Sequence, residues 1–173
     1  PTLTEVTFES NSSASFGGGM NNYISHPTLT NVTFSSNTTS TSYGGGMYNI
    51  GSNPTLTNVT FSSNTSPSNG GGMYNHGSHP TLTNVTFNAN TGFAGGAMFN
   101  YNSAPDIYNS IFWVDSAVSP ITNSISSPKI YNSVVKGDCP AGGICSNVIA
   151  ADPKLGTLGN YGGLTNTIPL LAG

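Results

Sequence analysis

Apolar and polar residues alternate along this chain in a pattern that restarts every 23 to 27 residues. Each restart opens with a proline and a short polar–apolar–polar stretch, which is Thr-Leu-Thr in the first four copies. A second alternating stretch, Val-Thr-Phe in those copies, follows after one residue. A repeat of this length predicts a solenoid, in which each unit buries its apolar residues against its neighbours. The restarts lie at Pro1, Pro27, Pro54, Pro80, Pro105 and Pro128.

The alternation predicts three short strands in each repeat. Leu3 and Val6 are three positions apart, so a bend at the fourth and fifth positions is needed to return both side chains to the core. Asn fills the fifth position in five of the six copies and suits such a corner, since it tolerates left-handed backbone. A third strand is expected after each glycine-rich run, which allows a tight turn. It would contain Met20, Met47, Met73 and Met98.

These features predict an all-β fold, a right-handed single-stranded parallel β-helix of about six to seven coils. Residues 1–104 are expected to form four regular coils and residues 105–152 two divergent coils that include a Cys139–Cys145 loop. Residues 153–173 are expected to form a tail or cap. Ala141-Gly142-Gly143-Ile144 is interpreted as the glycine-run element of the sixth copy.

One polar position of the repeat is expected to form a ladder along the stack. Side-chain amides at equivalent positions of stacked coils can hydrogen-bond to one another. The eleventh residue of each repeat is the candidate, and the predicted ladder is Asn11, Asn37, Asn64, Asn90, Asp115 and Asp138.

The amino-acid composition excludes several classes of function. Only 5% of the residues are charged, and three lysines are the only basic residues besides histidine. This argues against nucleic-acid binding, which needs many basic side chains to neutralise phosphates. No apolar run approaches the length of a membrane span, so membrane insertion by this segment is not expected. Cys139 and Cys145 are close enough to form a disulfide, which favours an extracellular location.

Two motifs resemble those of known bacterial surface proteins. Phe-x-x-Asn at Phe8, Phe34, Phe61 and Phe87, together with Gly-Gly-Ala/Gly-Met, resembles the repeats of polymorphic outer-membrane autotransporter adhesins. The stretch from Asp152 to Thr165 is similar to the closing segment of surface β-helix proteins of the "choice-of-anchor" type. The resemblance implies a right-handed β-helix, export, and a role in surface adhesion or display.

A polysaccharide lyase or hydrolase is the alternative, because such enzymes share this architecture. Glycosidic hydrolysis needs two carboxylates about 5–10 Å apart. Asp115 and Asp138 would stack in adjacent coils, where a Ca²⁺ bridge is an alternative to a simple turn role. Asp106 and Lys129 are expected to form an exposed ion pair, and the histidines lack a third metal ligand. We therefore predict no catalytic residues, no cofactor and no metal.

Two surface arrays are candidate binding faces. Outward threonines of the first strand should form two columns, and ice-binding solenoids use similar grids. Aromatic residues after the methionines, Tyr48, Tyr74 and Phe99, are expected to point outward and could hold a glycan or another subunit. The threonine face comprises Thr28, Thr30, Thr55, Thr57, Thr81 and Thr83, continued by Thr2 and Thr4 in the first copy.

The ends of the repeat array bear on assembly. The first copy begins at Pro1, so a second copy stacking head to tail is expected to cover that edge. The apolar stretch Ile168–Leu171 is interpreted as a plug or donor segment. The sequence thus predicts a non-catalytic extracellular solenoid that is structural or adhesive, with copies of itself, glycans or host surface molecules as partners. Ice binding is a further alternative.

Overall fold

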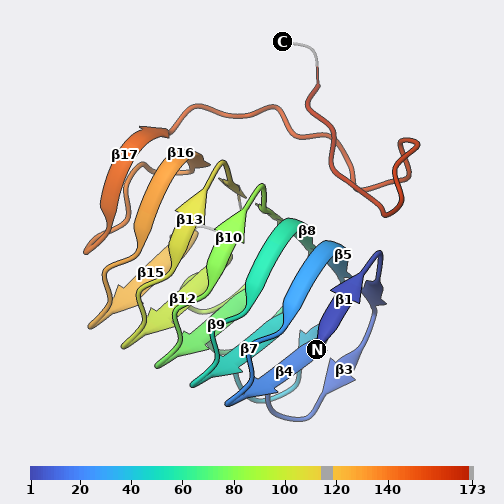
Figure 1. Cartoon of the computed structure of the whole chain (residues 1–173), viewed down its shortest axis with the longest axis vertical. Helices are drawn as coiled ribbons and strands as arrows, with labels where there is room; N and C mark the ends of the chain where they lie inside the picture. Colours follow the sequence, from blue (N-terminus) through green and yellow to red (C-terminus); the bar gives the residue numbers. More distant parts are fainter. Residues whose placement is uncertain (114–118, 172–173) are drawn as a thin grey trace.

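The computed structural model describes residues 1–113 and 119–171 and shows a stack of parallel strands (Figure 1). The strands form a β-solenoid of about five turns, and no helix occurs in the two described ranges. The predicted all-β parallel solenoid is therefore confirmed.

The largest sheet contains both alternating stretches of each repeat. Every pairing within it is parallel and joins equivalent residues of neighbouring coils, such as Leu29 with Leu56. Four of its strands (β5, β8, β16 and β17) run through both stretches, and in the other coils the stretches form separate strands. Its ten strands are β1 (Thr2–Thr4), β2 (Thr7–Glu9), β5 (Thr28–Ser35), β8 (Thr55–Ser62), β10 (Thr81–Thr83), β11 (Thr86–Asn88), β13 (Asp106–Tyr108), β14 (Ile111–Trp113), β16 (Lys129–Val135) and β17 (Ile144–Ile149).

The predicted methionine strands form a second, five-stranded parallel sheet. It faces the first sheet across the core, and its strands follow the glycine runs. Its members are β4 (Met20–Tyr23), β7 (Met47–Ile50), β9 (Met73–His76), β12 (Met98–Tyr101) and β15 (Ile121–Ser124). A small third sheet pairs β3 (Ser12–Ser13) with β6 (Thr38–Thr39).

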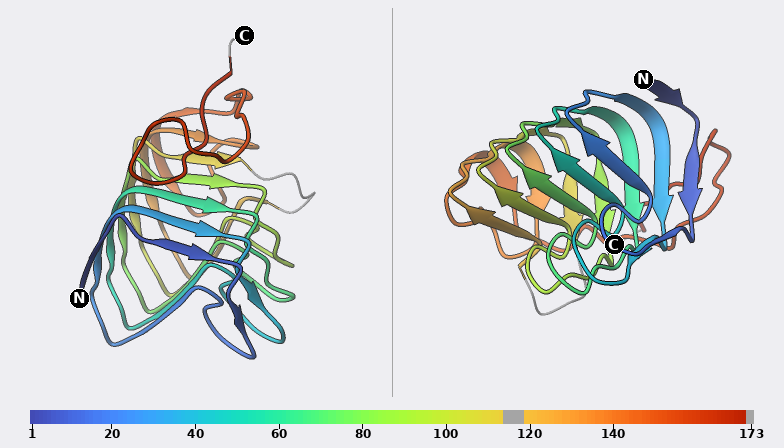
Figure 2. Two further views of the ribbon diagram at one scale, coloured as in Figure 1. Left: turned by 90° about the vertical axis from the view of Figure 1, so that its right-hand side faces the viewer. Right: turned by 90° about the horizontal axis from the view of Figure 1, so that it is seen from below.

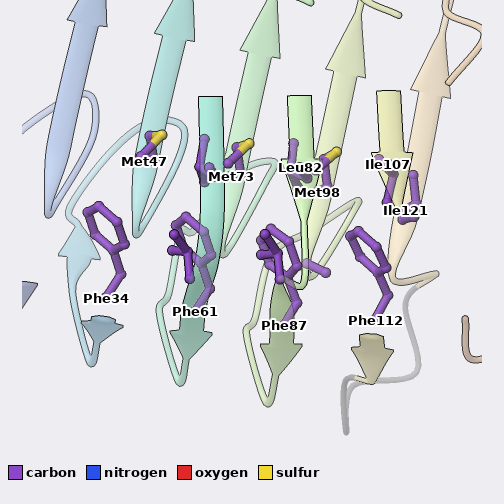
Figure 3. Packing of buried hydrophobic residues seen from close by; sticks show 14 of the residues in the cluster. Phe34, Met47, Phe61, Met73, Leu82, Phe87, Met98, Ile107, Phe112 and Ile121 are labelled. Carbon is purple, nitrogen blue, oxygen red and sulfur yellow. The ribbon is translucent and has the colours of Figure 1, made fainter. Parts of the chain in front are cut away.

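Identical side chains stack on one another in the core (Figure 3). The rings of Phe34 and Phe61 are parallel within 4°, and their centroids are 4.7 Å apart. The next ring along the stack, Phe87, lies 4.6 Å from Phe61. Leucines of the first strand and methionines of the third line the remaining sides of this apolar column. Because buried side chains of the regular coils contact copies of themselves in neighbouring coils, the in-register repeat determines the core.

Left-handed backbone marks the corner between the first two stretches, as predicted. Glu5, Asn31, Asn58 and their equivalents Asn84, Asn109 and Asn132 all have φ between 50° and 59°. Asn adopts this conformation at lower cost than most residues, which explains why it recurs there. The bend lets the leucine and the valine of one repeat both face the core.

The sixth coil is shorter than the sequence pattern predicts. Ile144 pairs with Lys129 of β16, so only fifteen positions separate equivalent residues of the last two strands of the first sheet. The interpretation of Ala141–Ile144 as a glycine-run element is wrong, because Ile144 already begins the next first-sheet strand, β17. This coil has no methionine-type strand, which leaves about five full turns instead of six to seven.

The tail folds back along the side of the stack and does not plug its end (Figures 1 and 2). After β17 the chain returns towards the first coils, where the Asn166 carbonyl accepts a hydrogen bond from Thr33 Oγ1. Two antiparallel bridges, Leu155 with Leu170 and Gly159 with Thr167, fold the tail onto itself. The stretch Ile168–Leu171, predicted to be a plug, therefore pairs within the tail.

Candidate binding surfaces

The predicted amide ladder is confirmed for its four asparagines. Asn11 donates from Nδ2 to Oδ1 of Asn37 over 2.9 Å, and the same bond joins Asn37 to Asn64 and Asn64 to Asn90. The second Nδ2 hydrogen of Asn64 is donated to the Phe34 carbonyl of the preceding coil. Both amide hydrogens are therefore used, which removes the cost of burying this polar group.

Asp138, which was predicted to continue this ladder, does not lie in it. Asp138 is exposed, has φ of 80°, and accepts a hydrogen bond from the backbone N–H of Cys139 over 2.8 Å. Its assignment to the ladder is wrong, because Gly137 and Asp138 form a turn that carries the chain out into the disulfide loop. Asp115 lies outside the described residues.

A second ladder, buried from Asn22 to Asn100, follows the third strand and was not predicted. It runs through Asn22, Asn49, Asn75, Asn100 and Asn123, with Nδ2–Oδ1 distances of 2.8–2.9 Å. The recurring Met-x-Asn triplet is the sequence signal that could have revealed it. The two ladders hold adjacent coils in one register on both sides of the core.

The disulfide loop closes the end of this inner ladder. Cys139 and Cys145 are bonded, as predicted, with their Cα atoms 6.0 Å apart. The carbonyl of Ala141, within the loop, accepts a 2.8 Å hydrogen bond from Nδ2 of Asn123. The last amide of the buried ladder therefore has a backbone partner, so the loop acts as a cap for the second sheet.

The threonine columns lie in register on the outer face of the first strand. Thr28 pairs with Thr55 and Thr30 with Thr57, and the columns extend from the first coil to the fourth. Their side chains are exposed or half-buried. This threonine face consists of Thr2, Thr4, Thr28, Thr30, Thr55, Thr57, Thr81 and Thr83.

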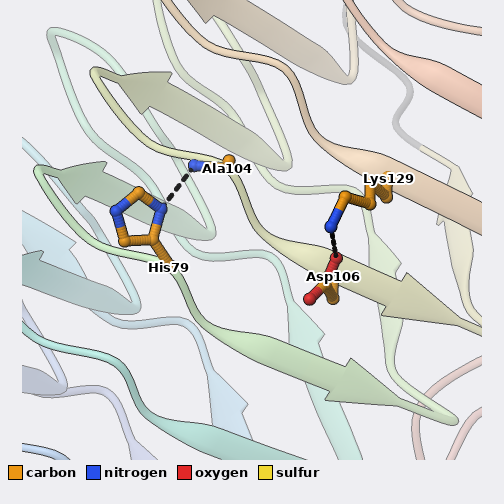
Figure 4. A network of polar contacts seen from close by, with 4 residues as sticks. All are labelled: His79, Ala104, Asp106 and Lys129. Carbon is orange, nitrogen blue, oxygen red and sulfur yellow. Dashed lines mark hydrogen bonds and ion pairs between the residues drawn. The ribbon is translucent and has the colours of Figure 1, made fainter.

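Charged and aromatic residues end the threonine face in the fifth and sixth coils, and Figure 4 shows the charged pair, Asp106 and Lys129. Lys129 Nζ lies 3.3 Å from Asp106 Oδ1, which confirms the predicted ion pair, although no hydrogen bond of good geometry reaches that oxygen. Beside it, Tyr108 and Tyr131 stack with centroids 5.3 Å apart. Because both charged side chains are partly exposed, the pair adds little stability.

The aromatic array is stacked, but its predicted exposure is wrong. Tyr48 and Tyr74 are each only 7% exposed, because Phe16 and Tyr43 from the preceding coils lie over them with centroids 4.6 and 4.5 Å away. Phe99 stays half-buried, and Asn69 of the preceding coil stands where Phe16 and Tyr43 stand in earlier coils. This burial raises the pKa of Tyr48, and it raises the pKa of Tyr74 to about 12. A ligand face on Tyr48 and Tyr74 would first require those rings to move.

Histidine side chains serve as corner acceptors. His26 Nδ1 accepts the backbone N–H of Asn53 over 2.9 Å, and His79 Nδ1 accepts that of Ala104 over 3.0 Å (Figure 4). Asn53 fills the same position in the coil between them and accepts from the backbone N–H of His79.

Acidic side chains are spread along the molecule. Asp106 pairs with Lys129, and Asp152 pairs with Lys154 at 3.7 Å. In residues 1–113 and 119–171, no three His, Cys, Asp or Glu side chains gather into a group that could hold a metal ion. The same ranges contain no helix that is long and apolar enough to cross a membrane.

The tail creates two hollows against the outer face of the second stretch. One, of about 300 Å³, lies between Asn31, Asn58 and the tail residues 163–167. The other, of about 340 Å³, lies between Asn88, Trp113 and the tail. Neither was predicted, because the sequence does not show which face the tail covers.

Comparisons of the chain with family models, with curated proteins and with solved structures gave no match.

Proposed function

We propose that this chain is a non-catalytic extracellular β-solenoid that acts as a structural or adhesive surface element. The observation that carries the proposal is the threonine face, an in-register polar surface presented by a stack that is tied together by two internal amide ladders. A rigid, nearly uncharged rod of this kind can offer many equivalent contacts to a partner. The proposal also rests on the resemblance of the Phe-x-x-Asn repeats to those of surface adhesins.

Two further features support a location outside the cell. The Cys139–Cys145 disulfide is of a kind that persists in oxidising compartments. The polar side chains of the regular coils are mainly Thr, Ser and Asn, with Glu5 and Glu9 as the only charged residues before Ala104. Cell-surface glycans and proteins are partners that such a hydrogen-bonding face could contact.

The structure favours the scaffold over a polysaccharide-acting enzyme. Glycosidic hydrolysis requires a proton donor and a second carboxylate in one groove. Of the described acids, Asp106 and Asp152 already pair with lysines, and Asp138 binds the backbone of Cys139. Each therefore has a local partner that accounts for its position.

Head-to-tail assembly into a filament receives less support than adhesion by single molecules. A copy stacking on the last coil would need the edge of β15 in the second sheet. The disulfide loop already occupies part of that edge through the bond from Asn123 to Ala141. Self-association would then be confined to β17 in the first sheet.

Ice binding is a second candidate, favoured by the threonine columns alone. Their partners are in register over four coils, and adjacent parallel strands are about 4.8 Å apart. The columns end at the Asp106–Lys129 pair, so an ice face would span only the first four coils.

The test compares the wild type with a variant that carries Thr30→Lys and Thr57→Lys on the threonine face. The purified, oxidised chain is coated on beads and tested on cell monolayers and on a glycan array. We expect binding that the double variant loses while its circular dichroism spectrum and melting temperature are retained. A matched control, Thr41→Lys, changes an exposed loop residue outside the face.

The same samples also test the two alternative functions, a polysaccharide-acting enzyme and an ice-binding protein. Release of reducing ends or unsaturated products from polysaccharides, abolished by Asp→Asn substitution, would overturn the non-catalytic assignment. Thermal hysteresis that disappears in the double variant would favour ice binding over adhesion. Equal binding by the wild type and the double variant would exclude the threonine face as the contact surface.

A further inference from the structure

We propose a separate binding site for a neutral sugar ring in the hollow between Trp113 and the folded-back tail. Trp113 is the only tryptophan of the chain and ends β14 on the outer face of the second stretch. The hollow is lined by Asn88, Trp113, Asp152, Lys154, Leu155, Gly156 and Leu171. Its volume of about 340 Å³ lies at the lower end of the range for ligand pockets, about 300–1,000 Å³.

Trp113 has different neighbours in the coils before and after it. Asn88 pairs with Trp113 in the preceding coil, and Lys136 lies next to Trp113 in the following coil. Lys136 Nζ stands 5.8 Å from the centre of the indole ring, on the side of the later coil. Because Asn88 lines the hollow and Lys136 does not, the opposite ring face is the one available to a ligand.

The tail forms a firmly bonded second wall. The Gly156 N–H donates to the Pro169 carbonyl over 2.8 Å, and the Leu171 N–H donates to the Lys154 carbonyl over 2.7 Å. Asp152 Oδ1 accepts the backbone N–H of Lys154 over 2.8 Å, which fixes the carboxylate at the rim. These bonds hold the tail in one conformation, and the bond from Thr33 Oγ1 to the Asn166 carbonyl attaches it to the stack. A ligand therefore meets a wall that is already folded.

Charge and chemistry select a neutral polyhydroxylated ligand. Asp152 and Lys154 lie 3.7 Å apart and cancel each other, so the lining carries no net charge. The negative face of an indole ring attracts the weakly positive C–H groups of a pyranose. The Asn88 amide can donate and accept hydrogen bonds, and the Asp152 carboxylate can accept them from adjacent hydroxyls. The paired charges therefore give neither a free cation nor an anion a net attraction.

Tryptophan fluorescence reports on this site directly, since no other tryptophan contributes. The oxidised full chain is titrated with cellotetraose, maltotetraose, mannotetraose and chitotetraose, with tetragalacturonate as an anionic comparison. We expect a saturable change in emission with at least one neutral oligosaccharide, with a dissociation constant on the order of 0.1–1 mM for so small a site. No saturable change with any of the four, or tighter binding of the anionic probe, would overturn the proposal.

Two substitutions locate the binding. Asn88→Ser introduces the residue that Ser35 and Ser62 supply at this position in earlier coils, so the fold accommodates it. Asp152→Asn keeps the acceptor for the Lys154 N–H. Each is expected to weaken binding roughly tenfold by removing one ligand hydrogen bond. Thr57→Ser, on the threonine face, serves as the control and should leave the affinity unchanged.

The outcome separates this site from the proposed surface function. Sugar binding that survives both substitutions would place the site elsewhere and overturn the assignment to Trp113, while leaving adhesion through the threonine face untouched. Conversely, the Thr30→Lys and Thr57→Lys variant should keep the fluorescence response even where it loses adhesion.

Discussion

The regular coils and the C-terminal region of this solenoid are stabilised by different means. In residues 1–104, buried side chains and ladder amides contact equivalent residues in neighbouring coils. From Pro128 onward equivalents are fewer, and the chain relies on bonds that occur once. These are the Cys139–Cys145 disulfide, the Asn123–Ala141 hydrogen bond and the bridges within the tail.

The contrast shows how the disulfide loop ends the repeating pattern of the second sheet. A further identical coil would expose another unpaired ladder amide and another strand edge. The sixth coil instead omits its third strand, and the disulfide loop satisfies Asn123 in its place. Substitutions in the regular coils and in the C-terminal region should therefore lower the free energy of unfolding by different amounts. They should also disturb different parts of the chain.

The largest effect is expected from a charge in the middle of the buried ladder. Asn75 is fully buried, accepts from Asn49 and donates to Asn100. Asn75→Asp replaces the donor with a carboxylate oxygen that faces Oδ1 of Asn100. We expect a loss of about 3 kcal/mol or more in the free energy of unfolding, measured by urea denaturation.

The matched substitution at the end of the same ladder is Asn123→Asp. Asn123 is half-buried, so water can solvate the carboxylate, and the cost should be about 1 kcal/mol. Equal losses for the two substitutions would mean that position along the stack does not determine the cost.

A methyl group at the glycine run tests the packing of the regular coils. A Cβ on Gly46 would lie 2.6 Å from the Gly72 carbonyl oxygen and 2.9 Å from the Phe61 ring. Gly46→Ala should therefore cost roughly 1–3 kcal/mol, seen as a lower melting temperature. Ala97 occupies the same position where the Phe87–Phe112 angle opens to 14°, so Ala97→Gly is the control and should cost less. A neutral Gly46→Ala would show that the stack spreads easily.

Removing the disulfide should loosen one end only. With Cys139→Ser and Cys145→Ser, we expect a loss of about 2 kcal/mol, since a short covalent loop restrains the unfolded chain. Hydrogen exchange should accelerate in β17 and the 139–143 loop and stay slow in β8. Loss of protection in β8 as well would show that the end region stabilises the whole stack.

Alkaline pH should act through the covered tyrosines of the regular coils. Their pKa is raised above the ordinary value of 10.0 because burial disfavours the phenolate, and that of Tyr74 reaches about 12. The folded state then holds its phenol protons when the unfolded chain releases them, so this stability is complete below about pH 10 and falls towards pH 12. Urea midpoints measured across this range should decline, and Tyr74→Phe should flatten the decline. An unchanged slope in that variant would contradict the burial of Tyr74.

Local patterns of the sequence were sufficient to predict the stack. The spacing of Leu3 and Val6 predicted the bend, the recurring fifth-position asparagine predicted left-handed corners, and the Asn11 ladder followed from one aligned column. Contacts between non-equivalent positions of the repeat could not be predicted by aligning its copies. Covering of Tyr48 by Phe16 joins two coils at different positions, and the tail's path depends on a face that alternation does not specify.

The direction of the inner ladder has a consequence for how such a molecule can change length. Each amide from Asn22 to Asn100 donates a hydrogen bond to the next coil, and all but Asn22 also accept one from the coil before. Every internal unit therefore offers the same donor on one side and the same acceptor on the other. Duplicating or deleting one unit of about 26 residues leaves every join matched and moves the cap by one strand spacing, about 4.8 Å. Tandem duplication of the gene segment could thus lengthen the rod stepwise without redesigning either end.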